Sequence, residues 1–518
     1  ECPPGESRKS MISWGRTPTL GWLTEHQANI PRSAILIMVP DYRSGRAGTL
    51  VSLNAKSIIM KPYYARCVSM LTCPLDFRYG RKEMKAIFSE DHRIDLQLKV
   101  EAALARAHAK VGTIPRSAAE EITAKASIAI VPRERVSEIE AETKHDVMAM
   151  VKALSERCGD SGRYVHLGAT SNDIIDTTTA LQLKAALDII EADLLALLST
   201  FADLAERHRT TICMGRTHGQ NAIPTTYGFK VAGYASEVMR HLERLREGRK
   251  RVCVGKLSGA IGTAAALGPK ARQVQAHMMK DLGLGYEEAA TQVVCRDRYA
   301  ELVCLMAIIC TSCERYATEV RNLQRSEIAE VAEPFDTKRQ VGSSTMAQKR
   351  NPIVSENVCG LSRIVRGFVP PTFENMVLWH ERDLTNSSAE RFTLPHVMIL
   401  TDDILVKMEG VYRGLTVNEG NMLRNIKAAK GMIMAEPVMM ALTSKGLGRQ
   451  EAHEIVRSTS MLAEEKGWDL ERALWRNPVV RKHLTKEELA SVMDPANYLG
   501  SAPEMTDAVV AKARKLLQ

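Results

Sequence analysis

Apolar residues recur at helical spacing over most of the chain from residue 70 onward, and residues 187–204 carry the longest such pattern. Spacings of three and four alternate along this stretch, at Leu187, Ile190, Leu194, Leu197, Phe201 and Leu204. A heptad-like stripe of this kind is typical of a long helix that buries one face in a bundle. The sequence therefore predicts a long bundle helix here.

Further helices are predicted on both sides of this stripe. One earlier helix face is formed by Leu96, Val100, Ala103, Ala107 and Val111. Gly112 and Pro115 are expected to end that helix. A second helical run begins at about Arg133, and a turn is predicted at residues 159–162. Later helical runs cover residues 227–245, 300–323 and 355–366.

The chain is expected to form an all-α fold. Aromatic residues make up only 5% of the chain, which also has 24 Met, and this composition favours helix-on-helix packing over a β-sandwich. We expect an N-terminal helical domain at 70–170, a central long-helix bundle at 171–420 and a C-terminal helical domain at 421–518. The segment 333–352 lacks periodicity, and a loop of that length inside a bundle is usually functional or disordered.

Residues 1–69 differ from the rest, because they are rich in Pro, Gly, Ser and Arg. We predict that they are a disordered or non-native extension. The chain begins at Glu1, and Met60 and Met70 are candidate natural starts. A cleaved targeting segment is the alternative interpretation.

Charge is concentrated in the same segment. The chain has a net charge of +9, and residues 1–69, with nine Lys/Arg and four Asp/Glu, contribute +5 of it. The body is therefore nearly balanced, which does not indicate nucleic-acid binding but suits an anionic small-molecule substrate.

The 11 cysteines are odd in number and show no disulfide framework, which is typical of free thiols in a cytoplasmic protein. Cys310 and Cys313 form a single CxxC inside a predicted helix, and we interpret them as buried thiols rather than metal ligands. No apolar run approaches the length of a membrane span. The motifs GxxxxGK[ST], GxGxxG, HExxH and GxSxG are absent.

The residues 342–352, with Glu356 one helical turn later, form the most informative segment. They combine Gly342, the hydroxyls of Ser343 and Ser344, and Lys349-Arg350-Asn351. Such a loop can fold over an anionic substrate and bring a hydroxyl to the reacting carbon. A basic, solvated surface loop is the alternative.

Four other polar clusters lie beside predicted helices. Thr170 and Ser171, in Gly168–Asp173, can present hydroxyls and N–H groups to a carboxylate, or form an ordinary helix cap. His218 lies between glycines in Gly215–Gln220 and is a candidate proton donor.

The remaining two clusters contain charged side chains. In Lys144-His145-Asp146, the aspartate can orient the histidine, or the trio can be a solvated helix face. In the segment 379–391, Arg382 and Arg391 can clamp a phosphate or carboxylate, although the segment can also be a charged helix surface.

Taken together and in this order, the clusters resemble the adenylosuccinate lyase family of the fumarase/aspartase superfamily. The resemblance runs from about Cys73 to Gln518. It includes the opening segment Pro74–Gly80 and the QVVCRD motif at Gln292–Asp297. One departure is Ala347, where the family usually has proline, so the loop is expected to be less rigid.

The resemblance implies an all-helical, three-domain subunit of the fumarase/aspartase type, in a homotetramer whose active sites take residues from three subunits. It implies β-elimination of fumarate from adenylosuccinate and from the succinylated aminoimidazole-carboxamide ribotide. It also implies that no cofactor or metal is needed, and that neither nucleic acid nor membrane is a partner.

The resemblance assigns roles to individual residues. Ser343 matches the catalytic base, His218 the general acid, and Glu356 the carboxylate that orients His218. The residues matched to substrate binding are Arg78, Tyr79, Lys144, His145, Asp146, Thr170, Ser171, Gln292, Lys349, Asn351, Arg382, Ser387 and Arg391. Two alternatives remain: another superfamily lyase or a carboxymuconate cycloisomerase, and a non-catalytic structural descendant.

Overall fold

The computed structural model describes residues 34–39, 49–54, 72–336, 345–346 and 348–518. The chain divides into two compact units, Glu1–Thr72 and Cys73–Gln518. In the first unit, β1 (Ala34–Val39) pairs antiparallel with β2 (Thr49–Asn54). The sequence analysis did not predict this hairpin, although β1 is a six-residue apolar run, a length that is typical of a strand.

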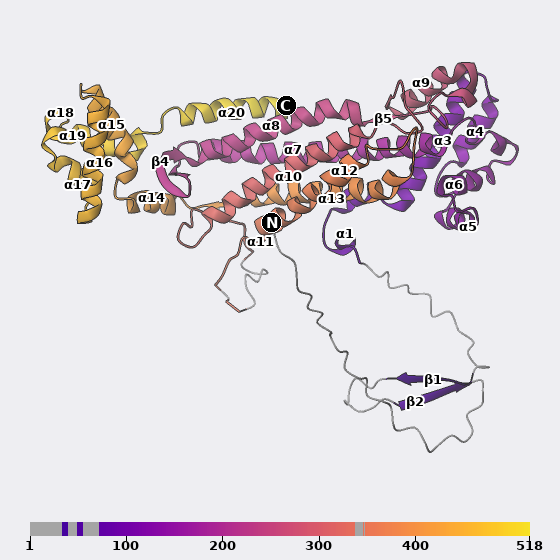
Figure 1. Cartoon of the computed structure of the whole chain (residues 1–518), viewed down its shortest axis with the longest axis horizontal. Coiled ribbons are helices and arrows are strands. Elements are labelled where there is room, and N and C mark those ends of the chain that lie inside the picture. The colour runs from indigo at the N-terminus through magenta and orange to yellow at the C-terminus, as the bar shows by residue number, and fades with distance from the viewer. Residues whose placement is uncertain (1–33, 40–48, 55–71, 337–344, 347) are drawn as a thin grey trace, which may run out of the picture. The chain divides into compact units, whose positions relative to one another are not determined.

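The second unit is built around long helices that lie side by side (Figure 1): α7 (Ser171–Arg207), α8 (Tyr227–Val252), α10 (Asp297–Leu323), α11 (Ile353–Gly367) and α13 (Thr385–Arg413). All six residues of the predicted stripe lie in α7, and none is more than 4% exposed. The long bundle helix is therefore confirmed. Its Phe201 packs edge-on against Tyr316 and Tyr412, both fully buried or nearly so.

A second buried core lies at the end of the bundle where α7 begins. It is shared by the helices α3 (Glu90–Lys110), α4 (Arg116–Lys125), α5 (Arg133–Thr143), α6 (Asp146–Ser155) and α9 (Ala271–Leu282). Four of the five predicted face residues lie in α3 and are buried, the fifth, Val111, is its C-cap, and Gly112 follows with a φ of 76°. The short helix η1 (Gly159–Tyr164) lies between α6 and α7, and η2 (Ala265–Lys270) directly precedes α9.

The helical run predicted from Arg133 is two helices rather than one. Lys144 has a φ of 56°, in the left-handed region, and its N–H bonds to the Glu140 carbonyl, so α5 ends there. His145 then caps α6, which begins at Asp146. The Lys144-His145-Asp146 motif is therefore a helix–helix junction and not a helix face.

A third core lies at the opposite end of the bundle. It is formed by α14 (Glu419–Ala428), η3 (Met432–Met434), α15 (Ala435–Ser444), α16 (Arg449–Lys466), α17 (Leu470–Arg476), α18 (Pro478–His483) and α19 (Lys486–Met493), followed by η4 (Pro495–Asn497). The last helix, α20 (Ala502–Leu517), packs on α7 and α8, and its Val510 and Ala513 belong to the bundle core. The domain boundary at 421 stays a prediction.

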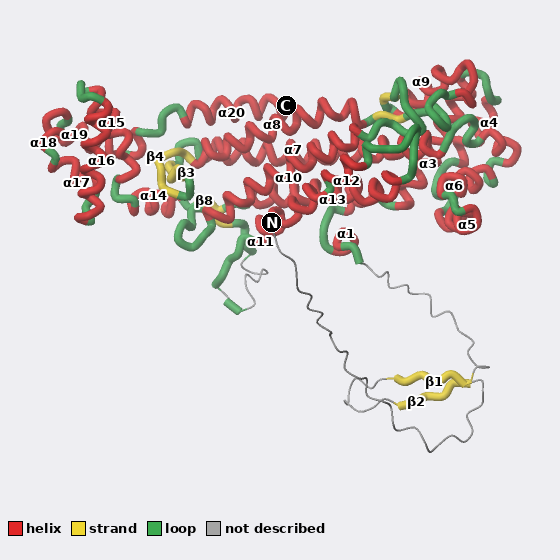
Figure 2. Tube along the Cα trace, viewed as in Figure 1, coloured by secondary structure: helices red, strands yellow, loops and turns green. Residues whose placement is uncertain are grey.

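The strands in the described part of the second unit have two to seven residues each (Figure 2). They pair as β3 (Ile212–Thr217) with β4 (Gln220–Thr226), β5 (Val254–Gly255) with β6 (Gly285–Tyr286), and β7 (Val331–Ala332) with β8 (Thr416–Val417). The all-α prediction is confirmed, although the β3–β4 hairpin was not foreseen. Met214 of β3 lies in the third core, so the hairpin is packed against the C-terminal helices.

Two further predictions concern side-chain environment and hydropathy. Cys310 and Cys313 are buried in α10, and burial raises the pKa of Cys310 to about 12, so both are confirmed as buried thiols. Among the described helices, none has the length and apolar character that a membrane crossing requires.

One guanidinium holds the segment that contains α1 (Pro74–Phe77) and α2 (Lys82–Ile87) against the bundle. Arg81 bonds to Asp402 through Nε at 2.9 Å and to Asp193 through Nη2 at 2.7 Å. Burial, together with the neighbouring Asp402 carboxylate, raises the pKa of Asp193 to about 7. Two acids therefore share one cation at the side of α7.

This arrangement predicts a dependence of stability on pH. Between about pH 4 and pH 7 the folded state binds the proton of Asp193 and the unfolded state does not, so the stability of the wild type falls as pH rises through this range. We expect Asp193→Asn, which cannot ionise, to gain melting temperature relative to the wild type between about pH 5 and pH 8. Asp203→Asn, on the same helix but paired with Arg514 at the surface, is the matched control and should show a constant difference. A constant difference for Asp193→Asn would contradict the raised pKa.

Candidate active site

The N-terminus of α7 gathers several of the predicted substrate-binding residues. Thr170 is the N-cap and forms a capping box with Asp173, whose Oδ2 accepts from the Thr170 N–H at 2.8 Å. Ser171 Oγ lies 3.5 Å from Nε2 of His145. The predicted cap is confirmed, and it presents a hydroxyl and the positive end of a long helix dipole beside an imidazole.

The junction between α5 and α6 brings its own polar groups to this end. His145 Nδ1 accepts a bond from the Met148 N–H at 3.4 Å, which leaves Nε2 facing Ser171. Asp146 accepts from Nη2 of Arg391 at 3.2 Å. Lys144 and His145 are both exposed, so they are accessible to a solute.

Arg382 is held at the same end by neutral groups. Its Nη1 donates to Gln292 Oε1 at 2.6 Å. With the amide oxygen of Asn172 facing it, Arg382 also donates from Nε and Nη1 at 3.0 Å each. Burial lowers the pKa of Arg382, and within the described residues it forms no salt bridge. A guanidinium in this state is prepared to bind an anion.

Arg296 is the opposite case, because two carboxylates surround it. Both of its Nη atoms bond to Asp176 at 2.9 Å, and its Nε bonds to Glu390 at 2.9 Å. Burial disfavours the Arg296 charge, but the two carboxylates outweigh it and raise the pKa of this guanidinium. Arg296 therefore fixes the 292–297 segment between α7 and α13 and has no capacity left for a ligand.

A cavity of about 370 Å³ lies beside these groups. That volume is within the range of small-molecule sites. Among the residues that line it are Asp146, Asn172, Arg382, Ser387, Arg391 and Glu390. The cavity therefore connects the two predicted phosphate-binding arginines with the start of α7.

His218 lies at the other end of the bundle. It occupies the tip of the β3–β4 hairpin with a φ of 54°, is followed by Gly219 with a φ of 73°, and is exposed. Arg216 anchors the hairpin through two bonds to Glu330, at 2.6 and 3.0 Å. Glu330 is 1% exposed, so this anchor is internal and leaves the histidine projecting.

The described part of the predicted substrate-closing loop lies at this second end. Gln324, which caps α10, donates to the Arg350 carbonyl at 3.2 Å. Lys349 and Glu356 are exposed, and Asn351 is half-buried. Ser343, Gly342 and Ala347 lie outside the described residues. In the described part of this single chain, no hydrogen bond joins Glu356 to His218, so that orienting role stays a prediction.

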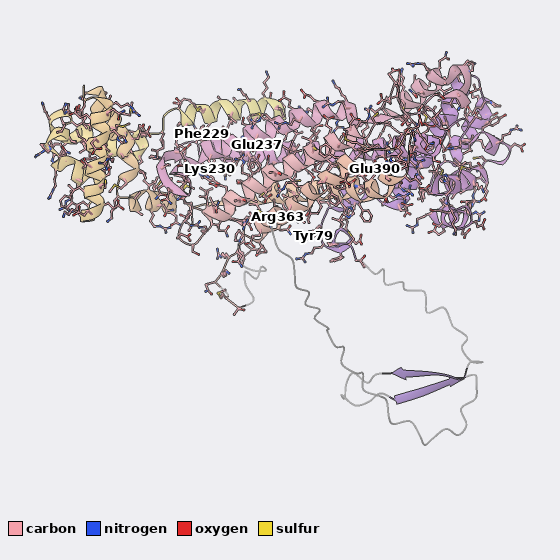
Figure 3. All side chains as sticks on the ribbon, in the orientation of Figure 1. Tyr79, Phe229, Lys230, Glu237, Arg363 and Glu390 are labelled. Atoms are coloured by element: carbon pink, nitrogen blue, oxygen red, sulfur yellow. The ribbon has the colours of Figure 1, made fainter. Side chains whose placement is uncertain are left out.

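Arg78 and Tyr79 occupy a third location. Tyr79 follows α1 on the flank of the bundle, with its ring 5.0 Å from Nζ of Lys407 (Figure 3). Arg78 is exposed there. The ring is thus held by the side of α13, away from the Glu390 end of that helix, which is also labelled in Figure 3.

A single chain does not bring the predicted residues into one site. The 37 residues of α7 separate Ser171 from the hairpin by about 55 Å at 1.5 Å per residue. The group at the start of α7 comprises Lys144, His145, Asp146, Thr170, Ser171, Gln292, Arg382, Ser387 and Arg391. The group at its other end comprises His218, Lys349, Asn351 and Glu356.

Sequence reasoning missed several residues of the first group. Asn172 and Asp176 belong to a motif that was recognised, and their polar character in an otherwise apolar helix was the available signal. Glu390 and Arg296 also lie in recognised motifs. Lys256 had no signal, because nothing in its neighbours indicates that it is fully buried.

Comparison with known proteins places this arrangement in a family. The family model described as "Lyase" matches residues 77–367, and the one described as "Adenylosuccinate lyase C-terminus" matches residues 431–509. A curated relative named adenylosuccinate lyase, from Pyrococcus abyssi (strain GE5 / Orsay), is 51% identical over 441 residues, which is 85% of this chain and 98% of the relative. Another of that name, from Methanocaldococcus jannaschii, is 49% identical and covers 85% of this chain and 96% of the relative.

Solved structures with the same fold come from the wider superfamily. A fumarate lyase from Mesorhizobium sp. BNC1 has a TM-score of 0.78 at 35% identity and covers 83% of this chain and 98% of its own. A 3-carboxy-cis,cis-muconate lactonizing enzyme from Pseudomonas putida has a TM-score of 0.78 at 34% identity, covering 85% and 98%. The predicted three-domain lyase type of fold is thereby supported over nearly the whole second unit. On the family matches and the near full-length relatives, the chain belongs to the adenylosuccinate lyase family.

Proposed function

We propose that the chain catalyses β-elimination of fumarate from adenylosuccinate, which releases AMP. We propose the same reaction on the succinylated aminoimidazole-carboxamide ribotide in purine nucleotide biosynthesis. The observation that carries this proposal is the sequence identity with relatives named adenylosuccinate lyase, which is 51% in an alignment that covers 98% of the relative. The family model of the adenylosuccinate lyase C-terminus matches residues 431–509, so the similarity also includes the part of the chain beyond the bundle.

The electrostatics of the first group support a substrate with several negative charges. Arg382 has only amide partners among the described residues, and Arg391 is paired with one carboxylate at the surface. A phosphate can satisfy both guanidinium groups with charge-assisted bonds. Thr170 and Ser171 at the start of α7 would then hold a succinyl carboxylate near the helix dipole.

The elimination needs a base and an acid. The β-proton beside a succinyl carboxylate leaves to the base, the C–N bond breaks, and the departing nitrogen takes a proton from the acid. We assign these roles to Ser343 and His218. Loss of the β-proton builds a second negative charge on the adjoining carboxylate, and we assign its stabilisation to Lys349 and Asn351.

We further propose that each active site is assembled from several copies in a homotetramer. The support is the separation of about 55 Å between the two groups along α7, which no rearrangement of one bundle removes. Apolar side chains are also exposed in one chain on α10, on α11 and on the short helix α12 (Val369–Glu374), with Ile308 at 47%, Ile364 at 53% and Phe373 at 49%. Large apolar side chains exposed on neighbouring helices support an interface with another copy.

Two alternatives are weaker. A carboxymuconate cycloisomerase shares the fold at about one third identity, but the C-terminal match is to adenylosuccinate lyase. A structural descendant would have no need to keep the half-buried Arg382 with only neutral partners, because partial desolvation of an unpaired charge costs free energy. A cytoplasmic location stays a prediction that rests on the cysteines, which are free thiols throughout the described chain.

The deciding experiment is an absorbance assay of the purified protein with adenylosuccinate. We expect equimolar AMP and fumarate to form, with the products identified by chromatography. The lactone of carboxymuconate should not be formed from 3-carboxy-cis,cis-muconate under the same conditions. Turnover of the muconate with no turnover of adenylosuccinate would replace the proposed function by the cycloisomerase alternative.

Ser343→Ala is expected to abolish turnover while substrate binding is largely kept. A general base contributes about two to four powers of ten in rate, so kcat should fall by at least a hundredfold. Binding of adenylosuccinate, measured by calorimetry, should change little because the anion contacts come from other side chains. Ser344→Ala is the matched control, one residue away. A near-normal kcat in Ser343→Ala would remove the proposed base.

Mixing inactive variants tests the shared site. If Ser343 and His218 of one active site come from different subunits, tetramers that combine Ser343→Ala and His218→Ala chains contain some sites with neither lesion. Activity should therefore return in part after subunit exchange, which mass spectrometry of differently tagged chains can verify. Verified exchange without any recovery would place both residues on one subunit or one of them outside the site.

A further inference from the structure

A fully buried ion pair lies directly behind the start of α7. Lys256 follows β5, and its Nζ is 2.5 Å from Oδ1 of Asp173. Both side chains are 0% exposed. Asp173 also accepts from the N–H groups of Ser258 at 2.9 Å and Gly259 at 3.1 Å, in addition to Thr170. One carboxylate thus joins the cap of α7 to the 256–259 loop.

This pair belongs to a closed ring of contacts that passes through two predicted substrate-binding residues. From Gly259 the chain continues to Ala260, whose carbonyl accepts from Gln292 Nε2 at 2.8 Å. Gln292 in turn accepts from Arg382, and Arg382 donates to Asn172 when the Asn172 amide is oriented with its oxygen toward the guanidinium, the orientation that satisfies both groups. Asn172 precedes Asp173 in the chain, which closes the ring. The ring therefore consists of hydrogen bonds and of short stretches of backbone between the bonded residues.

Stability alone gives little reason for a charge pair at this position. Removing two charges from water costs free energy that their mutual attraction repays only with excellent geometry, and apolar replacements of buried pairs are often neutral or stabilising. What the pair supplies here is position. Its four donors on one carboxylate fix the loop 256–260 relative to α7.

We infer that Lys256 is a positioning residue for the reaction. Through Asp173 and the 258–260 loop, it fixes the positions of Gln292 and Arg382 relative to the start of α7. Lys256 does not touch the substrate in this assignment, because its side chain is fully enclosed. The inference rests on the proposed function, since Gln292 and Arg382 are taken as substrate-binding groups.

Lys256→Met tests this, because methionine nearly matches the lysine chain in volume and removes the ammonium group that bonds to Asp173. We expect kcat/KM for adenylosuccinate to fall at least about tenfold, since small misplacement of binding groups is costly in rate. The larger part should be a rise in KM, with a parallel loss of inhibition by AMP. Hydrogen–deuterium exchange should accelerate in peptides that cover residues 257–264 and 290–293, and remain unchanged in the middle of α10.

Two further variants make the result decisive. Lys230→Met is the matched control, because Lys230 pairs with Glu319 between α8 and α10, toward the opposite end of the bundle from Glu390 (Figure 3). It should leave kcat and KM unchanged. Thr177→Val is the second probe, since Thr177 Oγ1 bonds to both the N–H and the carbonyl of Lys256 at 3.2 Å. This isosteric change buries no unpaired charge, and we expect kcat/KM to fall about threefold to tenfold in the same direction.

The outcomes separate the inference from the function on which it rests. A wild type that does not turn over adenylosuccinate overturns the proposed function. An active wild type with unchanged kinetics in folded Lys256→Met and Thr177→Val overturns the positioning role, even if melting temperatures fall. If Lys256→Met does not fold, as judged by circular dichroism, Thr177→Val decides alone, with a raised KM and faster exchange at 257–264 supporting the role.

Discussion

The length of one unbroken helix governs how this protein can work. In α7, 37 residues bury an apolar stripe from end to end, and a helix packed in this way cannot fold back on itself. Polar groups that precede it and follow it are therefore kept about 55 Å apart. The phosphate-binding candidates lie at one end and the candidate acid at the other. Any site that uses both must take its two halves from different copies of the chain.

Three cations in the described part of the chain hold irregular segments against the long helices. Arg81 joins the N-terminal segment to two acids on α7 and α13, Arg296 joins the 292–297 segment to the same two helices, and Lys256 joins the loop after β5 to α7. Each cation meets carboxylates that are themselves buried, so its charge is compensated internally. These pairs fix irregular segments that helix packing alone would leave undetermined.

The fold could be predicted largely because its signal is periodic. The stripe in α7 and the face in α3 were readable, since a helix that buries one side must repeat its apolar residues. Local reversals were less readable. Lys144 ends α5 in a left-handed backbone conformation that lysine does not favour, and the strands β3 and β4 show no strict alternation of apolar and polar residues. In these places, tertiary packing and turn geometry decide the structure, and single-residue preferences do not.

In the candidate site, too, some residues could be predicted from the sequence and others depend on tertiary contacts. Arg382, Gln292 and the Thr170-Ser171 cap were identified from motifs, and the structure brings them together. Their supports, Asn172 and Lys256, act through partners that lie far away in the sequence, and burial of a lysine has no local signature. The difference between the half-buried Arg382 and the buried Arg296 is also not visible in the sequence: Arg382 has amide partners, whereas Arg296 has two carboxylates. A bound anion would complete the half-buried Arg382, which has no carboxylate partner among the described residues, and this separates Arg382 from the cations that only join segments of the chain.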